Sequence, residues 1–547
     1  MMPTHYSFKS YNNRRAATIL TLVLFIAIIL RMWFVIGAQP VIGFANNFDF
    51  IRQSACIGLW EDYGDRAKDR PHREGPAPRL VFDGDRRQYY CLKSIDNVFP
   101  YLAAHAHRKH DLVDLREVGF WKGFFAILAC ALLLLQRMPP YARVFMALAT
   151  FLCIGDLETL SYANTLYLEF SVILASTLAL ATCALLGAQS APPRLRDLWL
   201  PAVSFAWLGL TKQQYGGLAT VMAVIAAWIL LSKWRQRRSA ALLLAVGLAA
   251  PISFNAINDT PWGLVGAASD ANHADTFLGT VLPAATDVGS ALKMLGMPDA
   301  CRSAVGENWY TRGFQTHDPC PAVRHVSRLR LLRLFLSQPT TFTIPMAHAV
   351  ALTQPSHHND MQRFEQPTDA TRIRYRVLWT TSPTWVFARL PPVLYRALVA
   401  AAMLACPIAL GLRLLWLTRC PNRASPRTQL GLSMLSMGSI AVFYTIASTV
   451  FGDGYQDVRR HAAVLPVGLT FVAIGCMCWI FESIRSTDPR TSIVKDRRGA
   501  DPAIAVETNR NFPDHRAAGF YRTCRRALHI LGLPGAYCRC SHPSRPR

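Results

Sequence analysis

Charged side chains are scarce in this sequence. Asp, Glu, Lys and Arg make up only 17% of its 547 residues, whereas 52% of the residues are hydrophobic, and the mean hydropathy is +0.19. A soluble domain of this length has no core large enough for so many apolar side chains. The composition therefore excludes an ordinary soluble protein, and lipid must cover the surplus.

Acidic residues are the scarcer of the two charged types: 34 Asp and Glu stand against 58 Lys and Arg, a formal net charge of +24. In a soluble protein this excess would suggest a nucleic-acid partner. Here much of the arginine lies in short connections between apolar segments and in the C-terminal tail, which attraction to anionic lipid headgroups explains better. We therefore expect membrane lipids as partners and no nucleic acid.

Familiar catalytic signatures are absent as well. The sequence has no glycine-rich phosphate loop, no nucleophile elbow and no zinc-protease motif. Its 14 cysteines do not fall into a zinc spacing, and the adjacent His357 and His358 would point apart, with no third ligand placed by spacing. We expect no metal site.

Long apolar segments, in contrast, are abundant. Crossing a bilayer takes roughly 20 mostly apolar residues in one helix. The segments that approach or reach this length are residues 16–38, 119–136, 143–155, 166–187, 198–210, 215–232, 239–257, 393–415, 430–450 and 462–484. The first is too long for a signal peptide and has no clear cleavage site after it. The sequence thus predicts an all-α integral membrane protein with about ten transmembrane helices, of which the third and fifth are short.

Arginine and lysine fix the orientation of these helices, because positive residues stay in the cytoplasm. Basic clusters occupy alternate short connections, at residues 137–143, 194–196, 233–238 and 419–427. With a cytoplasmic N-terminus, the two large loops, 39–118 and 258–392, are extracytoplasmic. Residues 1–484 then form one polytopic membrane domain, and residues 485–547 are a basic cytoplasmic tail whose composition predicts disorder.

Each large loop contains a pair of cysteines, Cys56 with Cys91 and Cys301 with Cys320. Several of the other cysteines lie inside apolar segments. Because disulfides form in an oxidising compartment, the two loop pairs are candidate disulfides.

Polar residues gather at the outward ends of the predicted helices. Asp49 comes soon after the first helix, so its carboxylate would lie just outside the bilayer, with Arg52 three residues further on. Asp49 is a candidate catalytic or substrate-binding residue. Alternatively, Asp49 and Arg52 form a surface ion pair on one helix.

A second polar cluster, residues 162–169, enters the fourth predicted span with Asn164, Tyr167 and Glu169. If the helix extends back through the whole segment, Tyr162 and Glu169 share one face two turns apart, with Asn164 and Tyr167 nearby. A carboxylate within a membrane helix is costly unless it faces a cavity or a partner, so Glu169 is a candidate site residue. Its alternative role is a structural ion pair with Lys212 or an arginine.

Two outward turns carry the remaining candidates. At the tight turn of Lys212 and Gln213, a cation and amides suit a phosphate or sugar hydroxyls, unless Lys212 only extends its ammonium to the membrane interface. In the last turn, Asp453 and Asp457 can orient hydroxyls, and Arg459 and Arg460 can counter a phosphate charge. The alternative for this turn is a solvated connection.

Taken in order, these segments resemble the WsfD-like bacterial membrane hexosyltransferases of glycan biosynthesis, which have a GT-C-like architecture. The segments that carry the resemblance are residues 47–52, 162–169, 212–214, 275–282 and 452–457, together with His461. The sequence departs from the family pattern at Gln213, where a proline is expected, and at Arg460, where a lysine is expected.

The resemblance implies a transferase of the bacterial inner membrane that moves a hexose from a polyprenyl-phosphate-linked donor to a glycan or lipid-linked acceptor on the extracytoplasmic face. Asp49 would deprotonate or orient the acceptor hydroxyl, and Lys212, Arg459 and Arg52 would stabilise the phosphate leaving group. Further substrate-binding roles fall to Asn164, Tyr167, Glu169, Gln213, Asp453 and Asp457. No cofactor is required, although the last two carboxylates leave room for a divalent cation.

Two other functions use the same kinds of residue. A transporter or flippase of lipid-linked saccharides would line its path with acids and cations, but no inverted repeat is evident, and the polar residues gather on one side of the membrane, away from the midplane. A glycan ligase or polymerase is the second alternative. The outward loop of residues 258–392 suits either enzyme.

Overall fold

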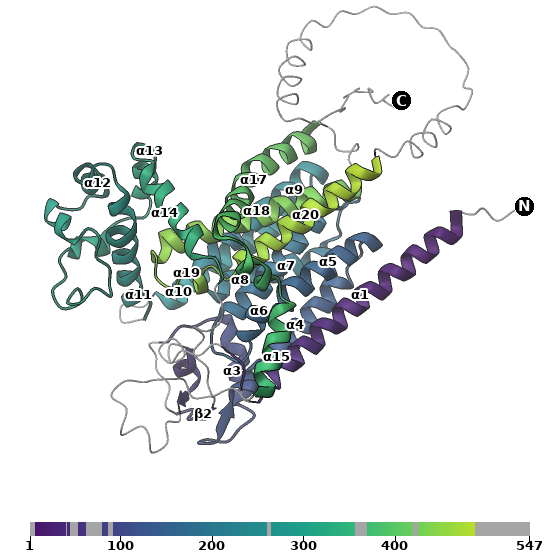
Figure 1. The fold of residues 1–547 in the computed structure, drawn as a ribbon, viewed down its shortest axis with the longest axis horizontal. Coiled ribbons are helices and arrows are strands. Elements are labelled where there is room, and N and C mark those ends of the chain that lie inside the picture. Colours follow the sequence, from purple (N-terminus) through teal and green to yellow (C-terminus); the bar gives the residue numbers. More distant parts are fainter. Residues whose placement is uncertain are drawn as a thin grey trace, which may run out of the picture. The chain divides into compact units, whose positions relative to one another are not determined.

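In the computed structural model, the described residues are 6–39, 41–43, 53–61, 79–85, 91–259, 264–355, 369–419 and 425–486. The chain divides into two compact units, Met1–Arg485 and Ser486–Arg547. The elements described below lie in the first unit, except for Ser486 at the end of the last helix, and they are predominantly helical (Figure 1).

Each of the segments predicted to span the membrane is a helix. These helices are α1 (Tyr6–Ile36), α4 (Leu115–Leu134), α5 (Pro140–Ile154), α7 (Glu169–Ala188), α8 (Trp199–Thr211), α9 (Gln213–Trp234), α10 (Arg237–Asn258), α17 (Pro392–Arg419), α18 (Pro426–Asp453) and α20 (Leu465–Ser486). Among the described residues, 7 helices are long and apolar enough to cross a membrane: α1, α4, α7, α9, α10, α18 and α20. Helices α5 and α8 are shorter, with 15 and 13 residues. The predicted all-α integral membrane fold is confirmed, and within the described residues seven of the expected spans are both long and apolar enough to cross a membrane.

Hydrogen bonds connect the first large loop to one set of helix ends, which we call the outward end of the bundle. Ser94 Oγ donates to the carbonyl of Thr211, the last residue of α8, at 2.8 Å. Asn258, the last residue of α10, donates to the carbonyl of Lys93 at 2.9 Å. The arginine-rich connections are at the opposite ends of the same helices, where the sequence places the cytoplasm.

Helix α7 is the central helix of the bundle. All of its membrane-spanning window is buried, whereas only 28% of the window in α1 is buried. Apolar side chains of α1 such as Leu22 and Trp33 are 55% and 71% exposed, as expected for a helix that faces lipid. Because α7 packs against α5, α8, α9 and α18, its first residue, Glu169, lies among the outward ends of several helices.

Glycines bring α18 and α20 into close contact. A Cβ atom on Gly438 would lie 2.6 Å from the carbonyl oxygen of Gly468, and one on Gly475 would lie 2.7 Å from that of Gly431. Small residues allow membrane helices to approach at backbone distance. This packing fixes both ends of the connection between α18 and α20, which contributes to the candidate site.

A small antiparallel sheet lies in the first large loop, and the sequence analysis did not anticipate it. Its strands are β1 (Leu59–Glu61), β2 (Arg79–Phe82) and β3 (Leu112–Asp114), in the order β1-β2-β3. Cys56 and Cys91, beside the sheet, form a disulfide with a Cα–Cα distance of 5.3 Å. Strands this short contain too few alternating residues to be read from the sequence.

The second large loop forms a set of short helices that we call the outward helical group. It comprises α11 (Leu264–His273), the π-helix η4 (Ala274–Val281), α12 (Val288–Leu295), α13 (Arg330–Ser337) and α14 (Thr340–Leu352). Buried side chains such as Phe277, Leu292 and Leu334 form its core. The disulfide between Cys301 and Cys320, with a Cα–Cα distance of 4.9 Å, closes this core.

Candidate functional site

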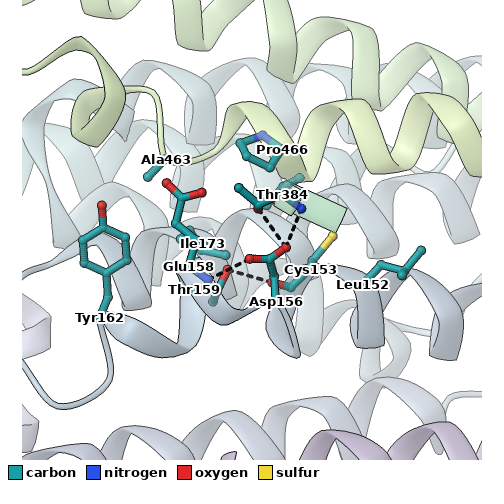
Figure 2. Close-up of a pocket in the computed structure, with 11 residues that line it drawn as sticks. Leu152, Cys153, Asp156, Glu158, Thr159, Tyr162, Ile173, Thr384, Ala463 and Pro466 are labelled. Carbon is teal, nitrogen blue, oxygen red and sulfur yellow. Dashed lines mark hydrogen bonds between the residues drawn. The ribbon is translucent and has the colours of Figure 1, made fainter. Parts of the chain in front are cut away.

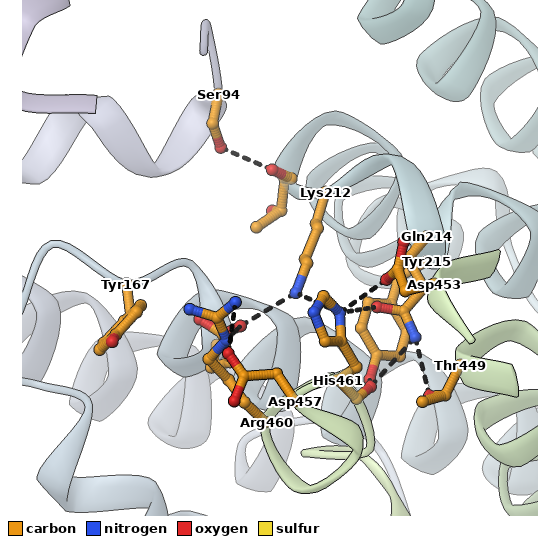
Figure 3. Close-up of polar contacts among 12 residues, drawn as sticks. Ser94, Tyr167, Lys212, Gln214, Tyr215, Thr449, Asp453, Asp457, Arg460 and His461 are labelled. Carbon is orange, nitrogen blue, oxygen red and sulfur yellow. Dashed lines mark hydrogen bonds and ion pairs between the residues drawn. The ribbon is translucent and has the colours of Figure 1, made fainter. Parts of the chain in front are cut away.

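The outward end of α7 holds a buried carboxylate with two cations (Figure 3). Glu169, 3% exposed, accepts a hydrogen bond from Lys212 Nζ at 2.9 Å, and Arg460 Nε lies 3.9 Å from the same Oε1 atom. Arg460 also contacts Asp457 at 3.1 Å and lies over the ring of Tyr167, with its Cζ 5.2 Å from the ring centroid. Lys212 and Arg460, from two different connections, thus meet at the carboxylate of the first residue of α7.

His461 extends this network toward α9 and α18. Its Nδ1 lies 2.9 Å from Asp453 Oδ2 and 3.2 Å from Gln214 Oε1. Because a carboxylate accepts and does not donate, Nδ1 carries the proton in this arrangement. The backbone carbonyl of His461 accepts from Tyr215 OH at 2.5 Å and from Gln214 Nε2 at 3.1 Å. We refer to Glu169, Lys212, Asp453, Arg460 and His461 as the ionic cluster.

Backbone conformation explains how one short connection contributes three members of the cluster. Helix α18 ends at Asp453, and Gly454 follows with φ 68°. Asp457 is in the left-handed region with φ 46°, directly before the single turn of α19 (Val458–His461). A Cβ atom on Gly454 would lie 2.6 Å from the carbonyl oxygen of Asp275, so glycine alone fits this reversal.

The outward helical group contacts the same connection. Arg328 Nη2 donates to the carbonyl of Gly452 at 3.0 Å. Asp275 Oδ1 accepts the backbone N–H of Trp309 at 2.7 Å. Burial raises the pKa of Asp275 to about 6, and the negative charge of Asp453 acts in the same direction. The group therefore adds a carboxyl whose pKa lies well above that of an ordinary aspartate.

A second buried ion pair, which the sequence analysis missed, supports the cluster. Lys122 Nζ lies 3.3 Å from Asp96 Oδ2, and the two side chains are 0% and 1% exposed. Lys122 also donates to the carbonyls of Thr165 and Tyr167, both at 2.9 Å. The pair thereby holds the segment that leads into α7. A lysine within the apolar α4 is the signal that could have revealed it.

A pocket lies near the cluster, between α5, α6 (Leu157–Ser161), α7, α16 (Pro383–Arg389) and α20 (Figure 2). Asp156 Oδ2 accepts from the backbone N–H and the hydroxyl of Thr384 at 2.9 and 2.8 Å. Glu158 lines the pocket, and in the described part of the chain its Oε2 has no hydrogen-bond partner. Burial, together with the charge of Asp156, raises the pKa of Glu158 to about 7.

Several predicted substrate-binding residues do come together. Glu169, Lys212 and Asp453 belong to the ionic cluster, and Tyr167 lies at its edge beneath an arginine. Asp457 is 61% exposed at the rim. The ion pair with Lys212, which was the alternative role for Glu169, is present.

Other predicted residues lie apart from the cluster. Asn164 is fully buried and donates at 3.1 and 3.0 Å to carbonyls in the last turn of α1 and shortly beyond it. Gln213 and Arg459 are exposed. Their neighbours Gln214 and Arg460 contact members of the cluster.

Two predictions cannot be compared with the structure, and one is corrected. Asp49 and Arg52 lie outside the described residues, as do His357 and His358. The condition that the helix extends back through residues 162–169 is not met, because α6 ends before this segment and α7 begins at its last residue. The intervening turn is held by the buried lysine of α4.

Within the described ranges, no group of three or more His, Cys, Asp or Glu side chains could hold a metal ion. The carboxylates on which a divalent cation would depend are engaged with other side chains. Asp453 pairs with His461, and Asp457 pairs with Arg460.

The fold and the site define a multi-pass, all-α membrane protein whose ionic groups gather at one end of the helical bundle. Residues 6–499 match the model of the family described as the YfdI N-terminal transmembrane domain. The chain belongs to this family. No curated protein and no solved structure matches the chain.

Proposed function

We propose that this protein is a membrane glycosyltransferase that moves a hexose from a polyprenyl-phosphate-linked donor to a glycan or lipid-linked acceptor, at the outward face of a bacterial inner membrane. The observation that carries the proposal is the convergence of Lys212 and Arg460 on the buried carboxylate of Glu169. Family membership supports a membrane function. The resemblance to the WsfD-like hexosyltransferases supports the transfer reaction.

The position of the ionic cluster suits such a donor. A polyprenyl chain stays in the bilayer while its phosphate lies at the level of the headgroups. The cluster lies at the outward ends of α7, α9 and α18, which is the level expected for that phosphate. Lys212 and Arg460 are 17% and 19% exposed, so each keeps a surface that can contact a ligand.

The reaction breaks the bond between the anomeric carbon and the phosphate oxygen, and the phosphate leaves with the bonding electrons. Lys212 and Arg460 stabilise its negative charge. The acceptor hydroxyl attacks from the opposite face, which inverts the anomeric carbon, and loses its proton to a carboxylate base. We assign that base to Asp49, on its place after α1 in the sequence and on the resemblance, with Arg52 as a further phosphate-binding cation.

The contacts change two assignments made from the sequence. Arg460 takes the place of Arg459 as the second phosphate-binding cation, because its Nε lies 3.9 Å from the carboxylate of Glu169. Gln214 takes the place of Gln213. The exposed carboxylate of Asp457 and the side chain of Tyr167 remain candidates for binding sugar hydroxyls.

Deletion of the gene, followed by mass spectrometry of lipid-linked intermediates, tests the proposal. We expect polyprenyl-phosphate hexose to accumulate and one hexose to be missing from a surface glycan. Complementation with Lys212→Met should leave this phenotype, whereas Lys293→Met, which removes an exposed lysine of α12, should restore the wild type. Purified protein in lipid nanodiscs should convert labelled donor to product. Transbilayer movement of intact donor in liposomes, without product, would overturn the proposal in favour of a flippase.

A further inference from the structure

Helix α13 presents apolar side chains on two opposite faces. Leu331 and Leu334 point into the core of the outward helical group and are 4% and 0% exposed. Leu329, directly before the helix, and Leu332 and Leu336 within it are 76%, 62% and 85% exposed. Their spacing of three and four residues aligns them in one stripe along the helix.

A cation accompanies this stripe. Arg333 is exposed and lies one helical turn from both Leu329 and Leu336, so it shares their face. Arg330 differs, because its side chain donates to the carbonyl of Leu295 inside the group. Neighbouring exposed leucines are unusual on a surface that meets only water. Leucines with an adjacent arginine are typical of a helix that lies in the plane of a membrane interface.

Aromatic contacts place α13 close to the end of a membrane-spanning helix. Phe335 of α13 packs on Phe451 in the last turn of α18, with ring centroids 4.8 Å apart. Phe342 of α14 packs on both rings, at 5.3 and 5.6 Å. Since α18 ends at Asp453, Phe451 lies near the level where hydrocarbon gives way to headgroups. Helix α13 is therefore at the height of the membrane surface.

We propose that the stripe of Leu329, Leu332 and Leu336, together with Arg333, docks on the outer surface of the bilayer. The leucines enter the boundary between headgroups and acyl chains, and the guanidinium pairs with headgroup phosphates. The binding partner of this stripe is lipid, because α13 packs on the end of α18 and the bilayer around α18 therefore lies beside α13. Docking holds the outward helical group in place over the connection that carries the ionic cluster.

The test uses full-length protein in lipid nanodiscs that contain an anionic lipid. Leu332→Cys and Leu336→Cys variants are labelled with a polarity-sensitive maleimide that cannot cross membranes. The unsubstituted protein, labelled in parallel, gives the background from the cysteines outside the two large loops, and the described cysteines of these loops are in disulfides. Ser303→Cys, at an exposed position of the same group, is the matched control.

Docking predicts that the probes at positions 332 and 336 emit at shorter wavelength and lose most of their emission to lipids with a nitroxide near the headgroup, whereas the probe at position 303 does neither. Arg333→Gln should weaken the quenching at position 332. Equal behaviour at all three positions would overturn the proposal. So would a shift that disappears in nanodiscs holding one copy of the chain, because a second copy would then be the occupant.

Discussion

Lys212 Nζ lies 2.9 Å from Glu169 Oε1, and this ion pair joins the connection between α8 and α9 to the first residue of the central helix α7. The two side chains are 17% and 3% exposed. In such a setting, removal of one partner leaves the other as an uncompensated charge away from water. The pair therefore has a structural role in addition to the proposed catalytic one.

Replacement of Glu169 by Gln should lower the free energy of unfolding by roughly 3 kcal/mol, the lower end of the range for buried pairs, because Lys212 keeps some contact with water. Adding Lys212→Met should recover part of the loss, since no charge is then unpaired. Unfolding of the purified protein measures both effects, and Lys293→Met controls for the removal of an exposed lysine. Losses that simply add would show that the two residues are not coupled.

The neighbouring arginines offer a second, internally matched comparison. Arg460 contacts Glu169 and Tyr167, whereas Arg459 is exposed. Arg460→Gln should raise the KM for the polyprenyl-phosphate donor by roughly tenfold or more, as expected when a charged hydrogen bond to phosphate is lost. Arg459→Gln should raise it far less. Steady-state kinetics at matched expression decides, and a larger effect of Arg459→Gln would restore the assignment made from the sequence.

These adjacent arginines also show where prediction from the sequence ends. The positions of the long helices follow from apolar run length, so all the predicted spans coincide with helices. The left-handed backbone at Asp457 determines which arginine of this short turn faces the ionic cluster. No periodic pattern in the sequence predicts that backbone conformation. Lys122 and Asp96 form an ion pair between two segments that are well separated in sequence. The sequence alone indicates only Lys122, as a charge inside an apolar segment, and not its partner.

The stability of the protein should depend on pH through Asp275. Burial raises the pKa of this carboxyl to about 6, so between its ordinary pKa of about 4 and this value the folded state binds the proton more tightly than the unfolded state. The free energy of unfolding therefore falls as pH rises through that window. Asp275→Asn retains an oxygen to accept from Trp309 and removes the titration. Its stability relative to wild type should increase from pH 4 to pH 7, and a difference that does not vary with pH would contradict this origin.

The disulfide between Cys301 and Cys320 should stabilise the outward helical group. It links residues separated by 19 positions, and a loop of that size corresponds to about 3 kcal/mol. Thiol labelling of denatured, unreduced protein should miss both residues, and Cys301→Ala should make Cys320 reactive. The Cys301→Ala/Cys320→Ala variant should unfold at lower denaturant concentration. Full labelling of both cysteines in the wild type would show that the disulfide does not form. It would then give no support for an oxidising outward compartment.

Asp49, the proposed base, lies outside the described residues, but Ile42, which precedes it in the sequence, is hydrogen-bonded to Asn164 in the segment that leads into α7. Asn164 Nδ2 donates to the carbonyls of Val35 and Ile42 at 3.1 and 3.0 Å. Asn164 also precedes the segment that Lys122 holds at the start of α7. Val35 and Ile42 are therefore held beside the segment that leads into α7.

Asp49→Asn keeps the size and hydrogen bonding of the side chain and removes its basicity. If Asp49 is the base, glycosyl transfer should fall by roughly 10²-fold or more, while the protein still inserts into the membrane and binds its donor. If Asp49 only pairs with Arg52, transfer should be almost unchanged, because an exposed ion pair contributes about 0–1 kcal/mol. Asp299→Asn, an exposed aspartate of the outward helical group, controls for a nonspecific loss of charge. Near-normal transfer by Asp49→Asn at matched expression would end its assignment as base and move that role to a carboxylate of the ionic cluster, Glu169 or Asp453.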